Sequence, residues 1–178
     1  MKERSVFHLI SDITKQKGVP CVLIGGFAVN FHKYTRQTND IDILITREDF
    51  EKISHFIIKA GYKEIANTDA FVQFKSTKLS LMDVDFGFVD QETLTNILKE
   101  GKEFYIAKQK FIVPSLNHLI ALKLHALKSN FKNRLLKDFQ DVAMLIKNNQ
   151  VDVRSASFKD MCLKYGTQEI YDRFLEVF

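Results

Sequence analysis

The sequence has 178 residues, of which 46% are hydrophobic and 27% are charged, and it contains only seven glycines and two prolines. This composition excludes a disordered or fibrous chain, and the length suffices for one α/β core with a helical annex. The sequence holds no run of about 18 apolar residues, so we expect no transmembrane helix. Its formal net charge of +4 is compatible with a nucleotide or RNA partner but does not require one.

The cysteines and the first residues of the sequence indicate the cellular compartment of the protein. Cys21 and Cys162 are too few for a disulfide framework and have no metal-binding spacing, so we expect both to be buried thiols. Residues 1–16 follow the pattern of an amphipathic helix and lack the apolar block and small-residue cleavage site of a signal peptide. We therefore expect a cytoplasmic protein that does not associate with a membrane.

Residues 1–46 predict a helix, a strand, a Gly-Gly turn with a short helix, and a second strand. Apolar residues at helical spacing indicate the first helix, and Gly18 and Pro20 end it. Residues 22–24 form a short apolar run, which we expect to be a central strand. The elements that follow are Gly25-Gly26, a short helix over 27–34, a polar turn over 35–39 and a strand over 40–45.

The rest of the chain predicts further strands and helices, and then helices alone. Thr46 is a suitable N-cap for a helix over 48–60, because Glu48 and Asp49 would lie in its first turn. The elements expected after it are strands around 71–74 and over 79–89, a helix over 93–98, a strand or hairpin over 103–113, and helices over 116–131, 134–147, 158–165 and 168–178. We therefore expect an α/β core over residues 1–113 and a helical domain over residues 114–178.

Two aspartates lie two residues apart on the strand predicted over 40–45. Because successive side chains on a strand point to opposite faces, Asp40 and Asp42 share one face, and the isoleucines between and after them point into the core. Two neighbouring carboxylates repel each other unless a cation lies between them. Such a pair is the usual oxygen-ligand site for Mg²⁺, which binds one or two carboxylates together with substrate phosphates.

The spacing of these residues resembles that of a known family. Thirteen residues separate Gly25-Gly26 from Asp40-Ile41-Asp42. This arrangement is similar to the nucleotidyltransferase signature of the DNA polymerase β superfamily. Within it, the sequence most resembles the minimal, AbiEii-like nucleotidyltransferase toxins. The resemblance implies an α+β fold, in which a mixed sheet is packed by helices and a helical region follows. It also implies that Asp40 and Asp42 bind Mg²⁺ and act in catalysis.

The family takes a third catalytic and metal-binding aspartate from a neighbouring strand. Asp83 and Asp85 share one face of the strand predicted over 79–89. We favour Asp85, because the family's third aspartate is followed by an apolar stretch, here residues 86–89. Asp83 remains the alternative, and a solvent-facing edge strand would give neither aspartate a catalytic role.

Further residues resemble the nucleotide contacts of the family. Gly25 and Gly26 would let the backbone approach a phosphate at the start of a helix. Lys123 matches a nucleotide-contacting lysine, whose point charge suits a triphosphate. Asp141 belongs to a segment, residues 134–142, that is similar to the family's Arg…Lys-Asp-x-x-Asp segment. The alternative is that the charged residues of that segment form salt bridges along one helix.

The resemblance implies a Mg²⁺-dependent nucleotidyltransferase that moves a nucleoside monophosphate from an NTP, such as ATP, to an acceptor hydroxyl. The toxin relatives suggest that the acceptor is tRNA or a protein side chain, and that the protein is the toxin of a toxin–antitoxin system with an antitoxin protein as partner. One alternative is an enzyme that modifies a small molecule such as an antibiotic. Another is a non-catalytic module that binds a nucleotide or a partner protein.

Overall fold

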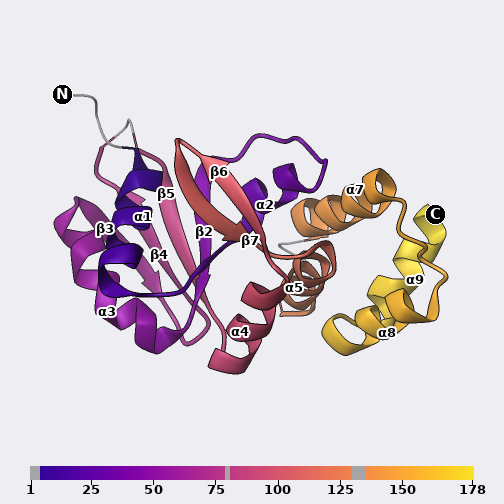
Figure 1. Ribbon diagram of the computed structural model, residues 1–178. Helices are drawn as coiled ribbons and strands as arrows, with labels where there is room; N and C mark the ends of the chain where they lie inside the picture. The colour runs from indigo at the N-terminus through magenta and orange to yellow at the C-terminus, as the bar shows by residue number, and fades with distance from the viewer. Residues whose placement is uncertain (1–4, 79–80, 130–134) are drawn as a thin grey trace. The chain divides into compact units, whose positions relative to one another are not determined.

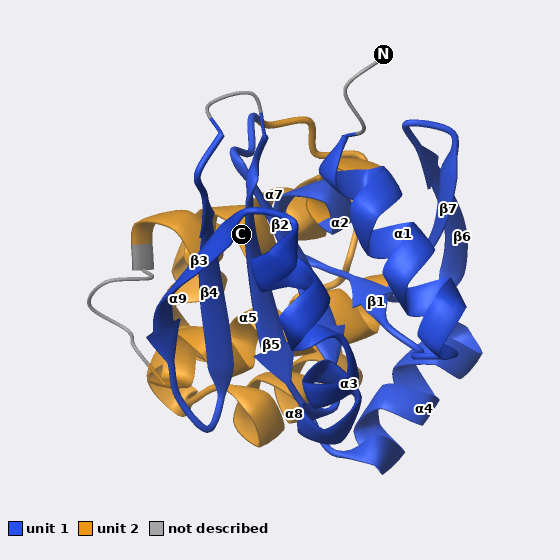
Figure 2. Ribbon diagram, turned by 90° about the vertical axis from the view of Figure 1, so that its left-hand side faces the viewer, with its two compact units in different colours: residues 1–28, 37–115 blue, residues 29–36, 116–178 orange. Residues whose placement is uncertain are grey.

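The computed structural model describes residues 5–78, 81–129 and 135–178 and has the expected α+β fold (Figure 1). The chain divides into two compact units (Figure 2). Unit 1 comprises residues 1–28 and 37–115, and unit 2 comprises residues 29–36 and 116–178. The chain first passes from unit 1 to unit 2 inside the helix α2, Gly25–Phe31. Residues 29–36, which precede the Asp40–Asp42 strand, therefore belong with the C-terminal helices.

Unit 1 contains a mixed sheet. Its order, among the described residues, is β1-β2-β5-β4-β3. The strands are β1 Val22–Leu23, β2 Asp40–Ile45, β3 Tyr62–Asn67, β4 Phe71–Ser76 and β5 Asp83–Phe88. β2 and β5 run parallel, whereas the other neighbouring pairs are antiparallel. The expectation that residues 22–24 form a central strand is wrong, because in the described part of the chain β1 lies at the edge of the sheet, beside β2. Its two side chains are buried because the hairpin described below and the helix α4, Gln91–Glu100, pack against it.

Helices and a hairpin complete unit 1. The helices are α1 Val6–Lys17, α3 Arg47–Lys59 and α4 Gln91–Glu100, and the hairpin strands are β6 Lys102–Ile106 and β7 Gln109–Val113. The Thr46 hydroxyl accepts a hydrogen bond of 3.1 Å from the Asp49 backbone N–H, which confirms the predicted N-cap of α3. Cys21 precedes β1, lines a surface groove and is only partly buried, contrary to expectation.

The apolar face of the sheet is covered by α3. Ile41 and Ile43 of β2 are fully buried, as expected. Phe86 of β5 lies opposite Ile43 in the strand register, and its ring centroid is 5.0 Å from that of Phe50 on α3. Because side chains alternate along a strand, this packing directs Asp42 to the opposite face.

Unit 2 is helical. It contains α5 Leu116–Ser129, a π-helical turn Leu135–Phe139, α7 Gln140–Asn149, α8 Ala156–Tyr165 and α9 Gln168–Val177. Phe158, Cys162 and Phe174 are buried where α8 and α9 pack together. The helix expected over 134–147 therefore begins with a π turn, and Arg134 lies outside the described residues. In a π turn each hydrogen bond spans one residue more than in an α-helix, and such turns occur often at functional sites.

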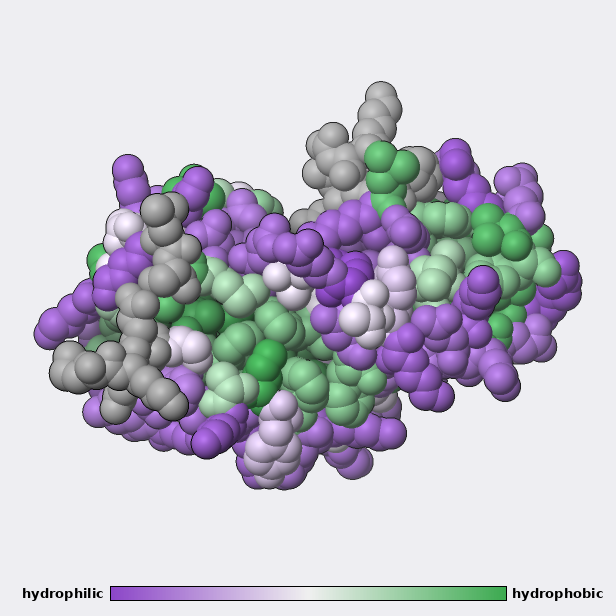
Figure 3. Space-filling model, turned by 90° about the horizontal axis from the view of Figure 1, so that it is seen from above, coloured by the Kyte–Doolittle hydropathy of each residue, from purple (hydrophilic) through white to green (hydrophobic). Residues whose placement is uncertain are grey.

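The surface is mixed. Figure 3 shows hydrophilic side chains over much of the face in view, interrupted by apolar patches. Large exposed apolar side chains include Tyr105 in unit 1 and Leu136 in unit 2. None of the helices in the described parts of the chain is both long and apolar enough to span a bilayer.

Candidate active site

Three aspartates from two neighbouring strands of unit 1 lie together. Asp40 and Asp42 are on β2, and Asp85 is the direct register partner of Asp42 on β5. One carboxylate oxygen from each residue lies within 4.8 Å of the other two, and all three residues are partly exposed. Carboxylates this close repel one another, whereas a hard divalent cation bound between them would be attracted to all three. The donor set therefore fits a cation such as Mg²⁺, which prefers oxygen ligands.

The two aspartates of β5 have different surroundings. Asp83 is the register partner of Asp40, but its Oδ1 accepts a hydrogen bond of 2.8 Å from the Ser76 backbone N–H. Its charge adds to burial, the larger cause, in raising the pKa of Tyr62 to about 12. The structure thus brings Asp85, rather than Asp83, into the cluster with Asp40 and Asp42.

Gly25 makes room for Asp42. The Ile24 backbone N–H donates to the Asp42 carbonyl oxygen over 2.9 Å, so the chain enters α2 directly beside Asp42. Gly25 has a φ of +61°, and a Cβ at this position would lie only 1.7 Å from Asp42 Oδ2. The sequence led us to expect that the Gly-Gly pair permits close approach of a phosphate. The structure adds a reason that concerns Asp42 alone: any larger residue at Gly25 would displace its carboxylate.

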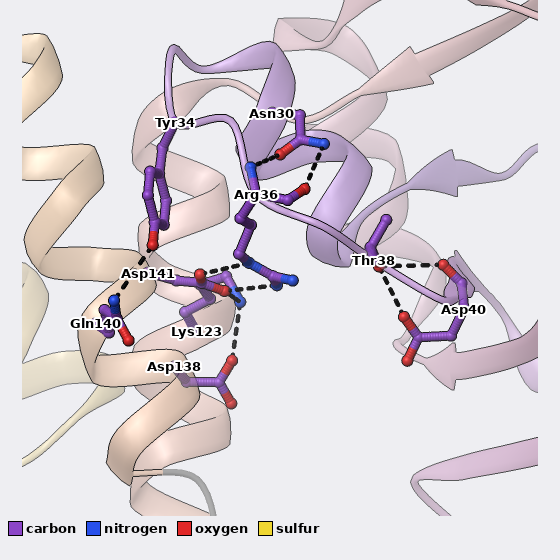
Figure 4. Close-up of polar contacts among 9 residues, drawn as sticks. All are labelled: Asn30, Tyr34, Arg36, Thr38, Asp40, Lys123, Asp138, Gln140 and Asp141. Atoms are coloured by element: carbon purple, nitrogen blue, oxygen red, sulfur yellow. Dashed lines mark hydrogen bonds and ion pairs between the residues drawn. The ribbon is translucent and has the colours of Figure 1, made fainter.

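Two neutral side chains hold the other carboxylates of the cluster. The Thr38 hydroxyl donates to Asp40 Oδ1 over 2.8 Å (Figure 4). Gln73, the register partner of Asp85 on β4, donates from Nε2 to Asp85 Oδ2 over 2.8 Å. Sequence analysis missed both residues. Thr38 could have been found from its place two residues before Asp40, but Gln73 carries no sequence signal.

Unit 2 holds a buried network of four charges (Figure 4). Arg36 binds Asp141 through two bonds, Nε to Oδ1 at 2.7 Å and Nη2 to Oδ2 at 2.9 Å. Lys123 Nζ lies 2.7 Å from Asp141 Oδ2 and 2.8 Å from Asp138 Oδ1. The exposed fractions are 16% for the Arg36 side chain, 8% for Lys123, 7% for Asp138 and 2% for Asp141. Two positive and two negative charges thus compensate each other in a largely buried setting.

The segment that carries Arg36 is fixed by further contacts within unit 2. Asn30 accepts a hydrogen bond from the Arg36 N–H at 2.9 Å and donates one to its carbonyl at 3.0 Å. Asn149 on α7 donates to the His32 carbonyl at 3.0 Å, and Asn148 donates to the Lys33 carbonyl at 2.7 Å. The contacts of Asn148 and Asn149 join residues more than 100 positions apart in the sequence, and Arg36 was not predicted from the sequence.

The network bears on the nucleotide contacts predicted from the sequence. The structure brings Lys123 and Asp141 into one ion pair, and it encloses the Lys123 ammonium group between two carboxylates. The aspartate cluster belongs to unit 1, and so do Gly25 and Gly26, with which α2 begins. The ion pairs seen among the described residues join Asp138 and Asp141 to Lys123 on α5 and to Arg36 before β2. Salt bridges within one helix stay the alternative for Arg134, which lies outside the described residues.

Comparison with known proteins identifies the family. A family model described as uncharacterised nucleotidyltransferase matches residues 8–177, which is nearly the whole chain. The chain belongs to this nucleotidyltransferase family. It is therefore an enzyme, a nucleotidyltransferase as expected, whereas the AbiEii-like subfamily stays a prediction. A search of curated proteins gave no match.

Solved structures share the fold. The antibiotic-resistance factor ANT(2″)-Ia superposes with a TM-score of 0.64 at 12% identity, over 96% of this chain and 91% of the other. An antigenic nucleotidyltransferase-like protein from Paracoccidioides brasiliensis gives 0.55 at 12% identity, over 96% and 90%. The lincosamide antibiotic adenylyltransferase LnuA gives 0.55 at 17% identity, over 80% and 92%. These similarities confirm the predicted fold class.

Proposed function

We propose that this nucleotidyltransferase transfers a nucleoside monophosphate from an NTP to an acceptor hydroxyl, and that Asp40, Asp42 and Asp85 hold the Mg²⁺ it uses. The observation that supports the proposal is the cluster itself, in which oxygens of all three carboxylates lie within 4.8 Å of one another. Mg²⁺ bound there would supply charge to stabilise the phosphoryl oxygens of the transition state. The chain's own residues bind and orient: β2 and β5 present the carboxylates, and Gly25 leaves the space that Asp42 occupies.

Nucleotide contact by Gly25, Gly26, Lys123 and Asp141 is part of the proposal. For the glycines, the support is the backbone turn at the start of α2, directly beside Asp42. For Lys123 and Asp141, the support is the resemblance to the family's motif, and their ion pair gives them a structural role as well. A test of these residues must therefore measure nucleotide binding separately from stability.

The acceptor that we propose is tRNA or a protein side chain, as in toxins of toxin–antitoxin systems, with an antitoxin protein as partner. A small-molecule acceptor is the competing proposal. Two structural neighbours are named for antibiotics, since one is an antibiotic-resistance factor solved with adenylyl-2″-tobramycin and the other is a lincosamide adenylyltransferase. At 12–17% identity they share only the fold, but they indicate which small molecules to include in an assay.

The test is label transfer from each of the four α-³²P-NTPs, with Mg²⁺, to total tRNA, to the protein itself, to tobramycin and to lincomycin. We expect label on one acceptor class, and its loss with EDTA. Asp42→Asn should lower the rate at least about 1,000-fold, because a bound metal supplies several kcal/mol of transition-state stabilisation. The variant should remain folded, which its melting temperature checks.

A matched pair of variants tests the choice of the third carboxylate. Asp85→Asn and Asp83→Asn change the same residue type on the same face of β5, but only Asp85 belongs to the cluster. We expect Asp85→Asn to abolish transfer and Asp83→Asn to retain it. The opposite pattern, or full activity of Asp42→Asn, would refute the proposed site.

A further inference from the structure

The residues that contact the aspartate cluster suggest how its geometry is maintained. Asp40 is held by the hydroxyl of Thr38, and Asp85 is held by the amide of Gln73. Both donors are uncharged and partly buried. Asp138 and Asp141 of unit 2 are held differently, by Lys123 and Arg36. A cationic partner brings a positive charge to a carboxylate, whereas a neutral donor can fix its orientation without adding one.

The sheet explains why Gln73 can act on Asp85. Asp42, Asp85 and Gln73 are direct register partners across β2, β5 and β4, so their side chains form one row on the same face. The amide at the end of the row fixes the Asp85 carboxylate. A carboxylate oxygen has two acceptor positions, so a group that accepts one hydrogen bond can still bind a cation.

We propose that Thr38 and Gln73 are uncharged positioning residues, which orient Asp40 and Asp85 for a divalent cation without adding a positive charge to the site. The inference rests on the proposed function, since it assigns these residues to the same metal site. Hydrogen bonds to metal-binding carboxylates orient the ligands, and loss of such an outer contact lowers metal affinity about 10- to 100-fold.

The test measures binding of Mn²⁺ alone to the full chain by electron paramagnetic resonance, which requires no knowledge of the acceptor. Thr38→Val and Gln73→Met keep the size of each side chain and remove the donor. Each should raise the dissociation constant for Mn²⁺ about 10- to 100-fold. Thr38→Ser restores the hydroxyl and should restore affinity to within a few-fold of wild type, which a merely structural role of the threonine methyl group would not explain.

The charge part of the proposal has its own variant. Gln73→Lys supplies a donor as well as a positive charge, so it should bind Mn²⁺ more weakly than Gln73→Met. Equal or tighter binding by Gln73→Lys would overturn the claim that a neutral donor is required. The matched controls are Thr95→Val and Gln91→Met, because these two exposed residues of α4 hydrogen-bond each other away from the cluster. Both controls should bind Mn²⁺ as the wild type does.

A second readout separates metal binding from turnover. In label transfer, Gln73→Met should raise the Mg²⁺ concentration for half-maximal rate, while the rate at saturating Mg²⁺ returns to within a few-fold of wild type. Wild-type affinity in both Thr38→Val and Gln73→Met, with binding abolished in Asp42→Asn, would overturn this inference and leave the proposed function standing. No Mn²⁺ binding by the wild type would overturn both.

Discussion

Gly25 offers a sharp test of how the backbone shapes the aspartate cluster, because the chain contains a matched glycine. Gly18 and Gly25 both have a positive φ, with values of +62° and +61°. A Cβ at Gly18 would have no described atom within 4 Å, whereas a Cβ at Gly25 would meet three atoms of Asp42 at 1.7, 2.4 and 2.8 Å. Gly18→Ala therefore measures the cost of a positive φ alone, and Gly25→Ala measures the cost of a positive φ with the clash added.

The magnitudes follow from these contacts. A left-handed backbone conformation destabilises a residue that has a Cβ by about 1–2 kcal/mol. Alanine also reduces the conformational entropy of the unfolded chain, which stabilises the folded state by about 0.4–1 kcal/mol. Gly18→Ala should therefore lower the free energy of unfolding by about 1 kcal/mol. At Gly25, rotation of the Asp42 side chain could relieve the contacts with its carboxylate. Rotation cannot move Asp42 Cβ, which would lie 2.8 Å away, so the backbone must shift as well. Such overpacking costs about 1–3 kcal/mol in addition.

Urea unfolding followed by circular dichroism would measure both free energies, and Mn²⁺ titration would measure the site. We expect Gly25→Ala to be less stable than Gly18→Ala by about 1–3 kcal/mol, and its affinity for Mn²⁺ to fall at least about tenfold because the Asp42 carboxylate is displaced. Gly18→Ala should keep wild-type affinity. If the two variants matched in stability and in Mn²⁺ binding, the argument that Gly25 exists to accommodate Asp42 would be refuted.

Two further predictions concern unit 2. Asp141→Asn should lower the free energy of unfolding by about 3 kcal/mol in urea, because it leaves buried cations without one of their two carboxylates. Glu169→Gln, which breaks an exposed pair with Arg173, should cost less than about 0.5 kcal/mol, and a similar cost for both variants would contradict the ion network's role. Burial raises the pKa of the Cys162 thiol to about 12, so in Cys21→Ser the remaining thiol should react with iodoacetamide at pH 8 only after urea is added. Above about pH 8.5 the unfolded thiol loses its proton, whereas the native thiol keeps it. The free energy of unfolding of Cys21→Ser should therefore fall as the pH rises above about 8.5. It should fall less in the double variant with Cys21→Ser and Cys162→Ala.

Local patterns in the sequence predicted much of the fold. The strand that carries Asp40 and Asp42 follows from strict alternation, and the start of α3 follows from Thr46, because both signals lie within a few residues. β3 was missed as a separate strand. Its middle residues, Lys63 and Glu64, are exposed at the edge of the sheet, so they show no apolar alternation. Charged residues on an edge strand discourage pairing with another chain, which is why such a strand resembles a loop in the sequence.

Long-range contacts account for what the sequence did not reveal. Arg36 and Asp141 are 105 residues apart, and no local pattern in either segment names the other as its partner. Gln73 acquires its contact with Asp85 only through the pairing of β4 with β5. The choice between Asp83 and Asp85 also rests on tertiary structure, since alternation places both on one face. Their surroundings differ because the Ser76 N–H meets Asp83, whereas the direct register partner of Asp85 is Asp42.

The two aspartate pairs of this chain show why residue spacing alone is ambiguous about function. Asp40 with Asp42 and Asp138 with Asp141 both match segments of the family signature, yet their electrostatic settings differ. Asp138 and Asp141 are buried with Lys123 and Arg36, so their charges are largely neutralised, and removing one partner should destabilise the fold. Asp40 and Asp42 are partly exposed and lie beside Asp85, so three carboxylates stand close together in the cluster for which we propose a cation. Removing one of these charges should spare the fold and impair binding. Stability and metal affinity therefore respond in opposite ways to the same Asp→Asn change in the two units.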